Sequence, residues 1–313
     1  MTTEQLPYND YGGVMRKRLG GRVQKLAIDA SMGCPNRDGR VAHGGCTFCL
    51  NEAFSPAYCR QAQSITEQIE RGIEFHRQRR RHGDIYLAYF QSGSNTYGDV
   101  GHLARLYNEA LSHPAISGII IGTRPDCISS ETLDLLEHIS THHFVSIEYG
   151  IESTSESTLA HVNRGHSFAQ ACDAIAKTRE RGIECGAHFI LGLPNETREQ
   201  IVAQTELINT LDIQSIKFHQ LQIYRNTPIA TEWSEHPERF LFAKETSAEE
   251  YSSLIVDILR RLRPTIAIER IASVAPHHLL LHSPLKGVRP DTLREMVVKR
   301  MLSLGATQGD LIG

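Results

Sequence analysis

Short runs rich in Val and Ile alternate with longer amphipathic segments between residues 23 and 223. The short runs have the length of strands, and the apolar positions of the longer segments repeat at helical spacing. The predicted strands are 23–30, 85–90, 116–123, 144–148, 185–191 and 215–223, and the predicted helices are 65–80, 100–112, 130–139, 155–181 and 198–210. Because each helix returns the chain across the sheet, we expect the strands to pair in parallel.

This alternation predicts an α/β fold, a partial (β/α)6 barrel of the TIM type. Six strand–helix units precede Pro228, which is too few for the usual eight-stranded barrel, and such barrels carry their chemistry at the C-terminal ends of the strands. The pattern then changes to an irregular stretch (228–246), a helix (248–263), a short strand (265–271) and a closing helix (290–304). We therefore expect a core of residues 1–227, with an N-terminal lead-in, and a C-terminal α/β extension of residues 228–313 that packs on the barrel.

Composition narrows the class of protein. The 313 residues include 33 Lys and Arg against 36 Asp and Glu, with 40% hydrophobic residues, which is typical of a globular enzyme and excludes collagen, coiled coil and disorder. A net charge of −3 argues against binding nucleic acid through bulk charge. No basic segment leads into an apolar run at the start, and no apolar run approaches the ~20 residues that cross a bilayer. We expect a cytoplasmic protein without a membrane partner.

Three of the seven cysteines, Cys34, Cys46 and Cys49, lie in one glycine-containing loop directly after the first predicted strand. An odd number of cysteines in a cytoplasmic protein argues against a disulfide framework. Thiolate ligands select soft metal centres, namely zinc, copper(I) or iron–sulfur clusters. A [4Fe–4S] cluster on three cysteines leaves one iron open, whereas zinc needs a fourth ligand such as His43 or a distant histidine. A loop that holds no metal is the third alternative.

The spacing Cys-x11-Cys-x2-Cys resembles the cluster loop of the radical S-adenosylmethionine (radical SAM) superfamily. The common spacing there is Cys-x3-Cys-x2-Cys, and the longer first gap is similar to that of the group containing the Elongator catalytic subunit and the YhcC/YtqA-like bacterial proteins. The similarity to the YhcC/YtqA-like family extends over nearly the whole chain and is carried by residues 20–26, 34–39, 89–97 and 122–126. On these segments the chain is identified as a member of that family.

The resemblance implies two cofactors, a [4Fe–4S] cluster on the three cysteines and S-adenosyl-L-methionine (SAM) on its open iron. It implies that Gln91, Ser92 and Gly93, after the second strand, correspond to the segment that contacts the methionyl amine of SAM. Read without the resemblance, these residues form an ordinary loop between a strand and a helix. The chain has no cysteine after Cys185, so a second cluster is not expected.

Four further residues receive a role from the resemblance. By similarity to oxygen-independent coproporphyrinogen oxidases, Glu152 would meet the ribose of SAM and Arg164 its carboxylate. The alternative is a plain ion pair between Glu152 and Arg164 at a helix start. His188 would point toward the ribose, unless it is a core histidine, and the segment at Gly192 would pack against the adenine.

The implied activity is reductive cleavage of SAM to methionine and a 5′-deoxyadenosyl radical that abstracts a hydrogen atom from a substrate. The expected partners are an electron donor such as flavodoxin or ferredoxin and, by analogy with the Elongator catalytic subunit, tRNA with its wobble uridine as the modified site. The alternatives are a small-molecule radical SAM oxidoreductase, an iron–sulfur redox sensor or electron carrier, and a zinc-stabilised binding module. No residue is singled out as the one that handles the substrate radical.

Overall fold

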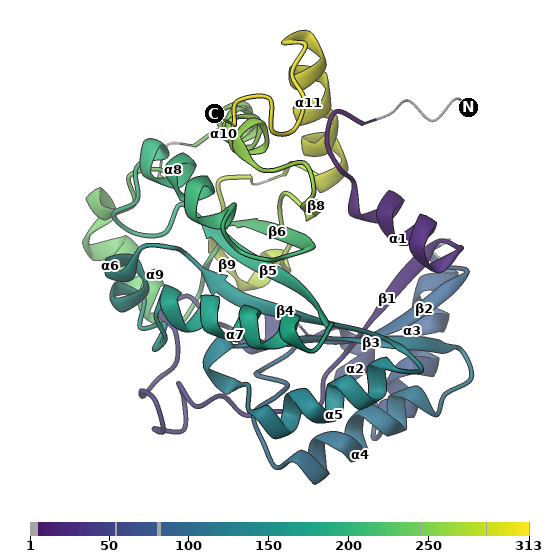
Figure 1. Ribbon diagram of the computed structural model, residues 1–313. Coiled ribbons are helices and arrows are strands. Elements are labelled where there is room, and N and C mark those ends of the chain that lie inside the picture. Colours follow the sequence, from purple (N-terminus) through teal and green to yellow (C-terminus); the bar gives the residue numbers. More distant parts are fainter. Residues whose placement is uncertain (1–5, 54, 80–82, 245, 286, 313) are drawn as a thin grey trace.

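A curled sheet of seven parallel strands forms the centre of the computed structural model, which describes residues 6–53, 55–79, 83–244, 246–285 and 287–312. In sheet order the strands are β1 (Val23–Ile28), β2 (Ile85–Phe90), β3 (Ile116–Thr123), β4 (Phe144–Glu152), β5 (Glu184–Leu191), β6 (Ser215–Gln220) and β8 (Ala267–Arg270). Every neighbouring pair in this sheet is parallel. The sheet curls into an open barrel (Figure 1), which confirms the predicted α/β partial barrel.

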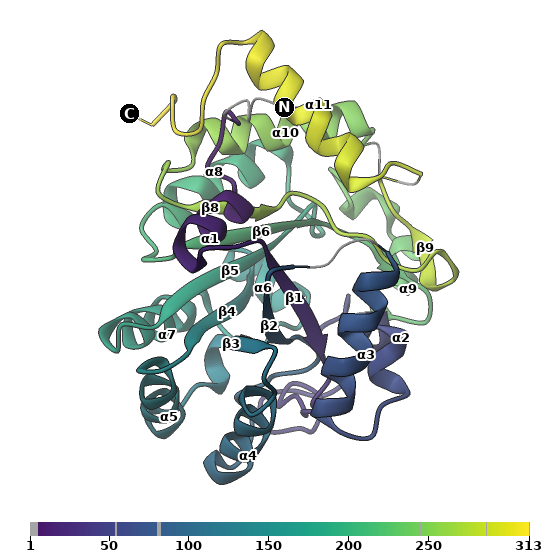
Figure 2. The same cartoon turned by 90° about the vertical axis from the view of Figure 1, so that its right-hand side faces the viewer.

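Helices that connect these strands lie around the outside of the sheet (Figure 2). They are α3 (Ile65–Gln78), α4 (Val100–Leu111), α5 (Ser130–Ser140), α6 (Glu156–His161), α7 (Phe168–Glu180) and α8 (Arg198–Ile208). The side chains of Ser129 and Thr197 accept hydrogen bonds from first-turn amides of α5 and α8, as expected for helix N-caps. Arg80, the last residue of the helix predicted over 65–80, lies outside the described residues.

The single helix predicted over residues 155–181 is wrong. The structure has two helices there, α6 and α7, separated by a loop at 162–167. Asn163 and Gly165 adopt φ angles of 51° and 75°, in the left-handed region, and a right-handed helix cannot continue through them. The break places Arg164 on an irregular segment rather than on a helix face.

The predicted strand 215–223 also divides in two. Its first part is β6, and its end is the two-residue strand β7 (Ile223–Tyr224), which pairs antiparallel with β9 (Leu280–His282) in a separate small sheet. The chain thus leaves the barrel after Gln220.

The C-terminal part contributes a strand to the barrel as well as helices. The short strand expected near 265–271 is β8, which pairs with β6 and adds a seventh strand to the six expected. The other elements are α9 (Pro228–Glu235), which lies in the stretch expected to be irregular, α10 (Ala248–Arg261) and α11 (Pro290–Ser303). Two helices near the N-terminus, α1 (Tyr11–Leu19) and α2 (Ala57–Arg60), were not predicted.

Charged side chains occupy the inside of the barrel, between the strands. Glu148 on β4 and Lys217 on β6 lie within runs of apolar residues and, although charged, are each only 2% exposed. Burial of charge on this scale requires partners, and these partners form part of the site described below. Within the described ranges, no helix has the length and apolar character needed to span a membrane.

Candidate functional site

A cavity of about 370 Å³ opens among the residues at and beyond the C-terminal ends of the strands. The predicted site residues that line it are Cys34, Cys46, Cys49, Gln91, Gly93, Glu152, Arg164 and His188. Ser92 and Gly192 do not line it. The Ser92 hydroxyl bonds to that of Ser55 at 2.6 Å, and Gly192 lies against Phe242, which an added Cβ would approach to 3.1 Å. The structure therefore brings the cysteines together with most of the residues expected to contact SAM.

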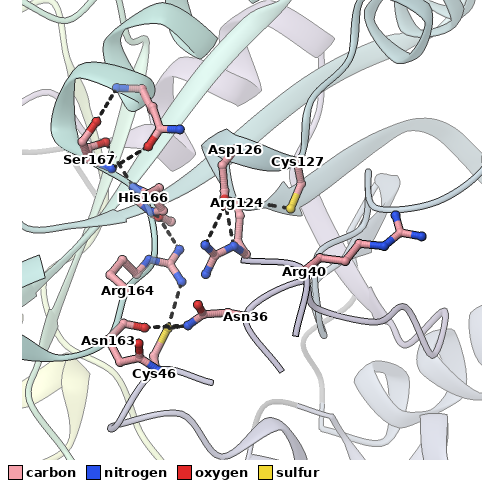
Figure 3. A network of polar contacts seen from close by, with 12 residues as sticks. Asn36, Arg40, Cys46, Arg124, Asp126, Cys127, Asn163, Arg164, His166 and Ser167 are labelled. Atoms are coloured by element: carbon pink, nitrogen blue, oxygen red, sulfur yellow. Dashed lines mark hydrogen bonds and ion pairs between the residues drawn. The ribbon is translucent and has the colours of Figure 1, made fainter. Parts of the chain in front are cut away.

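The cysteine loop is fixed by the break between α6 and α7. Asn36 Nδ2 donates to the carbonyl of Asn163 at 2.5 Å (Figure 3). Asn163 Nδ2 in turn donates to the carbonyl of Gly45 at 2.8 Å. Gly165 has no room for a side chain, because a Cβ there would lie 2.4 Å from Asn36 Oδ1. The left-handed loop after α6 thus positions the cysteine loop.

Nitrogen donors surround two of the cysteine sulfurs. Arg164 Nη1 and Asn36 Nδ2 lie 3.3 and 3.5 Å from Cys46 Sγ, and Arg37 Nη2 lies 3.5 Å from Cys49 Sγ. Burial and the neighbouring Cys46 raise the pKa of the Cys49 thiol to about 11, so the free thiol holds its proton at neutral pH. A metal centre would displace that proton on binding.

The donor set fits an iron–sulfur cluster. Three cysteines line one cavity, and N–H groups directed at ligand sulfurs are among the features that tune such clusters. Around the same loop, Asn36 Oδ1, Arg124 Nη1 and Arg164 Nε are buried, and none of them has a hydrogen-bond partner among the described residues. In the described part of the chain, no three His, Cys, Asp or Glu side chains stand arranged to hold a metal ion. His43, the histidine considered for zinc, is exposed.

Arg164 and Glu152 meet at the edge of the cavity. Arg164 is 7% exposed, its Nη2 donates to the carbonyl of Gly150, and the same nitrogen lies 3.6 Å from Glu152 Oε1. Glu152 has a φ of 77° at an irregularity in the β4–β5 pairing, a left-handed conformation that costs a non-glycine residue about 1–2 kcal/mol. Backbone strain of this kind clusters at ligand sites. The ion pair of the alternative interpretation is present, but neither residue lies in a helix, and both line the cavity.

His166 follows Arg164 and is held neutral. Its Nε2 lies 3.2 Å from the carbonyl oxygen of Gly150. Burial and the adjacent Arg164 charge lower the pKa of His166 to about 3.

Arg124 is a cavity residue that the sequence interpretation missed. Its Nε and Nη2 bond to the two carboxylate oxygens of Asp126 at 2.9 and 2.8 Å, and both side chains are nearly buried. The remaining nitrogen, Nη1, has no partner among the described residues. The signal was present in residues 122–126, which carry part of the family resemblance.

The interior charge network, defined as Lys25, Glu148, Lys217 and Glu269, was missed as well. Glu148 accepts from Lys25 Nζ at 2.8 Å, Lys217 Nζ at 2.5 Å and His188 Nε2 at 2.9 Å. Glu269 lies 2.6 and 3.0 Å from the same two ammonium groups. Burial alone would raise the pKa of Glu148, but Lys217, Lys25 and His188 outweigh it and hold that pKa well below its usual range. The network fixes His188 in the wall of the cavity.

Two family models match the chain. One described as the radical SAM superfamily covers residues 31–208, and one described as the Radical_SAM C-terminal domain covers residues 213–303. YtqA of Bacillus subtilis is 30% identical over 94% of this chain and 89% of its own length. YhcC of Escherichia coli K12 is 32% identical over 87% of this chain and 85% of its own length.

Two further similarities are more distant. A tRNA uridine(34) acetyltransferase of Dehalococcoides mccartyi is 23% identical over 63% of this chain and 41% of its own length. Among solved structures, the archaeal Elp3 of Methanocaldococcus infernus superposes with a TM-score of 0.66 at 17% identity. That match covers 91% of this chain and 64% of the other, and it shows a shared fold.

Proposed function

The chain belongs to the radical SAM superfamily, with YtqA and YhcC among its relatives, and from this premise we propose that it is an enzyme that cleaves SAM reductively. Enzymes of this superfamily use a [4Fe–4S] cluster and SAM. We assign the cluster to Cys34, Cys46 and Cys49. The observation that supports the proposal is that all three cysteines line the same cavity as Arg164 and Glu152.

A bound cluster would supply one electron to the sulfonium of SAM, whose C5′–S bond would break to give methionine and a 5′-deoxyadenosyl radical able to abstract a substrate hydrogen. The protein's own residues orient the cofactor and exclude water. In this proposal Gln91 and Gly93 receive the methionyl amine, and Arg164 binds the carboxylate in a two-pronged contact. Glu152 faces the ribose. His188 faces it as well, held in place by its hydrogen bond to Glu148 of the interior charge network.

We further propose tRNA as the substrate, modified at the wobble uridine. The support is the similarity to a protein named as a tRNA uridine(34) acetyltransferase and the fold shared with archaeal Elp3. An electron donor such as flavodoxin or ferredoxin completes the proposed system. The cytoplasm is the proposed location, and seven cysteines that all stand as free thiols fit a reducing compartment.

The decisive experiment is anaerobic reconstitution with iron and sulfide, followed by dithionite, SAM and detection of 5′-deoxyadenosine by mass spectrometry. We expect product from the wild type and none from Cys34→Ala, Cys46→Ala or Cys49→Ala, each of which should also lose iron. Cys172→Ala is the matched control, because Cys172 lies on α7 and does not line the cavity. This variant should retain its iron and form 5′-deoxyadenosine. A fully loaded wild type that gives no 5′-deoxyadenosine would favour a redox sensor or electron carrier instead.

The substrate proposal has its own test. Nucleosides from total tRNA of a strain that lacks this protein are compared with those of its parent. Loss of a modified wobble uridine, restored by the wild-type gene and not by the Cys46→Ala variant, is the expected result. An unchanged nucleoside profile would reject tRNA and favour a small-molecule substrate.

A further inference from the structure

Arg270, at the end of β8, lines the cavity and has no ion-pair or hydrogen-bond partner among the described residues. The other arginines of the cavity are all engaged. Arg124 binds Asp126, Arg164 contacts Glu152, and Arg37 donates to the carbonyl of Cys49 at 3.2 Å. An unpaired guanidinium that faces a cavity is a ready site for an anion.

The two carboxylates of the interior charge network are already shared by other cations. Glu269, the residue before Arg270, contacts both Lys25 and Lys217, and Glu148 contacts the same two lysines. This part of the barrel therefore holds three cationic side chains against two carboxylates. The third positive charge, on Arg270, is left for a group that enters the cavity.

Two uncharged polar groups line the cavity on the same side. His219 on β6 has no hydrogen-bond partner among the described residues, and burial together with the charges of Arg270 and Lys217 lowers its pKa well below the usual value. A neutral imidazole keeps one N–H to donate. Ser273 is fixed by Gln220, which bonds to its backbone N–H at 2.9 Å and its carbonyl at 2.8 Å, while the part of the chain that the structure describes offers its hydroxyl no partner.

We propose that Arg270, His219 and Ser273 form a subsite that binds an anionic group of the substrate, a carboxylate or a phosphate. The inference rests on the proposed radical SAM function and specifies the chemical class of its substrate. The guanidinium supplies charge and paired N–H donors, and the imidazole and hydroxyl supply single donors. SAM also carries a carboxylate, which the proposed function assigns to Arg164, so the experiment must separate the two sources.

The test measures binding of inorganic phosphate and of acetate by calorimetry to the cluster-loaded protein with saturating SAM present. Compared with the wild type, Arg270→Gln should bind phosphate at least tenfold more weakly. Arg270→Lys, which keeps the charge and loses the fork, should fall between the two. Arg225→Gln is the matched control, because Arg225 is exposed and outside the cavity, and it should bind phosphate and form 5′-deoxyadenosine as the wild type does.

Two outcomes would overturn the subsite. Equal phosphate and acetate affinities for the wild type and Arg270→Gln would show that Arg270 does not bind the anion. A tenfold loss of SAM affinity in Arg270→Gln, measured in the absence of phosphate, would show that Arg270 serves the carboxylate of SAM. Failure of the wild type to form 5′-deoxyadenosine would instead reject the proposed function, while the phosphate comparison would still report on the subsite.

Discussion

Replacing Glu148 by Gln removes one negative charge from the interior charge network while nearly preserving the volume of the side chain. In the wild type, two lysines and two glutamates balance, and Glu148 and Lys217 are each 2% exposed. The variant leaves Lys25 and Lys217 with Glu269 as their only carboxylate in the network. One buried positive charge is then uncompensated.

Breaking a buried ion pair from one side costs about 3–5 kcal/mol, because the remaining charge stays desolvated without its partner. We expect Glu148→Gln to lower the free energy of unfolding by that amount at pH 7. The native pKa of Glu148 lies below its unfolded value of about 4.3. The stabilisation that the Glu148 carboxylate gives the folded state is therefore complete above the unfolded pKa, and it is lost as the pH falls through the native pKa. The difference between variant and wild type should narrow below about pH 4.

The assay is urea unfolding of the cluster-loaded protein, followed anaerobically by circular dichroism at several pH values. Glu70→Gln is the control, because Glu70 is exposed on α3, and it should change the free energy of unfolding by less than about 0.5 kcal/mol. A second variant, Glu148→Gln combined with Lys217→Met, restores the charge balance.

The double variant makes the reasoning refutable. If Lys217 and Glu148 are coupled, the double variant should lose less stability than the sum of the two single variants. Additive losses, or a loss below about 1 kcal/mol for Glu148→Gln alone, would show that water or relaxation of the barrel compensates the charge. The structural account of the network would then be incorrect.

Three further predictions concern the site. The Arg164→Lys variant should keep its iron but bind SAM about tenfold more weakly, a loss of ~1.4 kcal/mol in binding free energy, because lysine has no planar fork for a carboxylate. Calorimetry measures this affinity, and an unchanged value would remove Arg164 from the SAM site. Gly93→Ala should lower the melting temperature clearly more than Gly182→Ala. Both glycines have positive φ, but a Cβ on Gly93 would lie 2.4 Å from the carbonyl oxygen of Met32, whereas Gly182 has open space, so equal shifts would contradict the clash. The pKa of His166 falls from about 6.5 unfolded to about 3 in the native state, so the unfolded chain binds a proton that the native chain does not, and stability should decline as the pH falls from about 6.5 toward 3. His166→Gln should flatten that decline in urea titrations, and an unaltered slope would assign it to other groups.

Hydrophobic patterning predicts a strand well where the residues of the strand itself determine where it begins and ends. The strands β2 and β3 begin and end at the predicted positions, because short apolar runs there are bounded by polar residues. The helix predicted over 155–181 fails because its apolar spacing continues through the break. Local residues stop the helix, because Asn163 and Gly165 adopt positive φ and Ser167 caps the start of α7. The bond from Asn163 to the carbonyl of Gly45, 118 residues earlier, then holds the break against the cysteine loop.

The site residues likewise fall into those that local spacing reveals and those that only the fold brings together. Cys34, Cys46 and Cys49 were identified from their spacing within one loop, and the structure places all three at the cavity. The interior charge network escaped prediction because a single lysine in a strand usually faces solvent, and alternation alone does not reveal that a curled sheet encloses it. Lys25 and Glu148 lie 123 residues apart, and the curl of the sheet brings β1 and β4 close enough for the two side chains to meet.

The docking of the cysteine loop onto the break after α6 has a consequence for biogenesis. The loop is made early in synthesis, but its anchor, the Asn36–Asn163 contact, spans 127 residues. A nascent chain that has not yet folded through α6 therefore presents three mobile thiols with no fixed geometry. Arg164, which lies against Cys46, arrives with the same segment. In the proposed function, iron incorporation therefore has to follow folding through α6. We expect a variant that disturbs the Asn163 loop to be recovered with less iron even though its cysteines are intact.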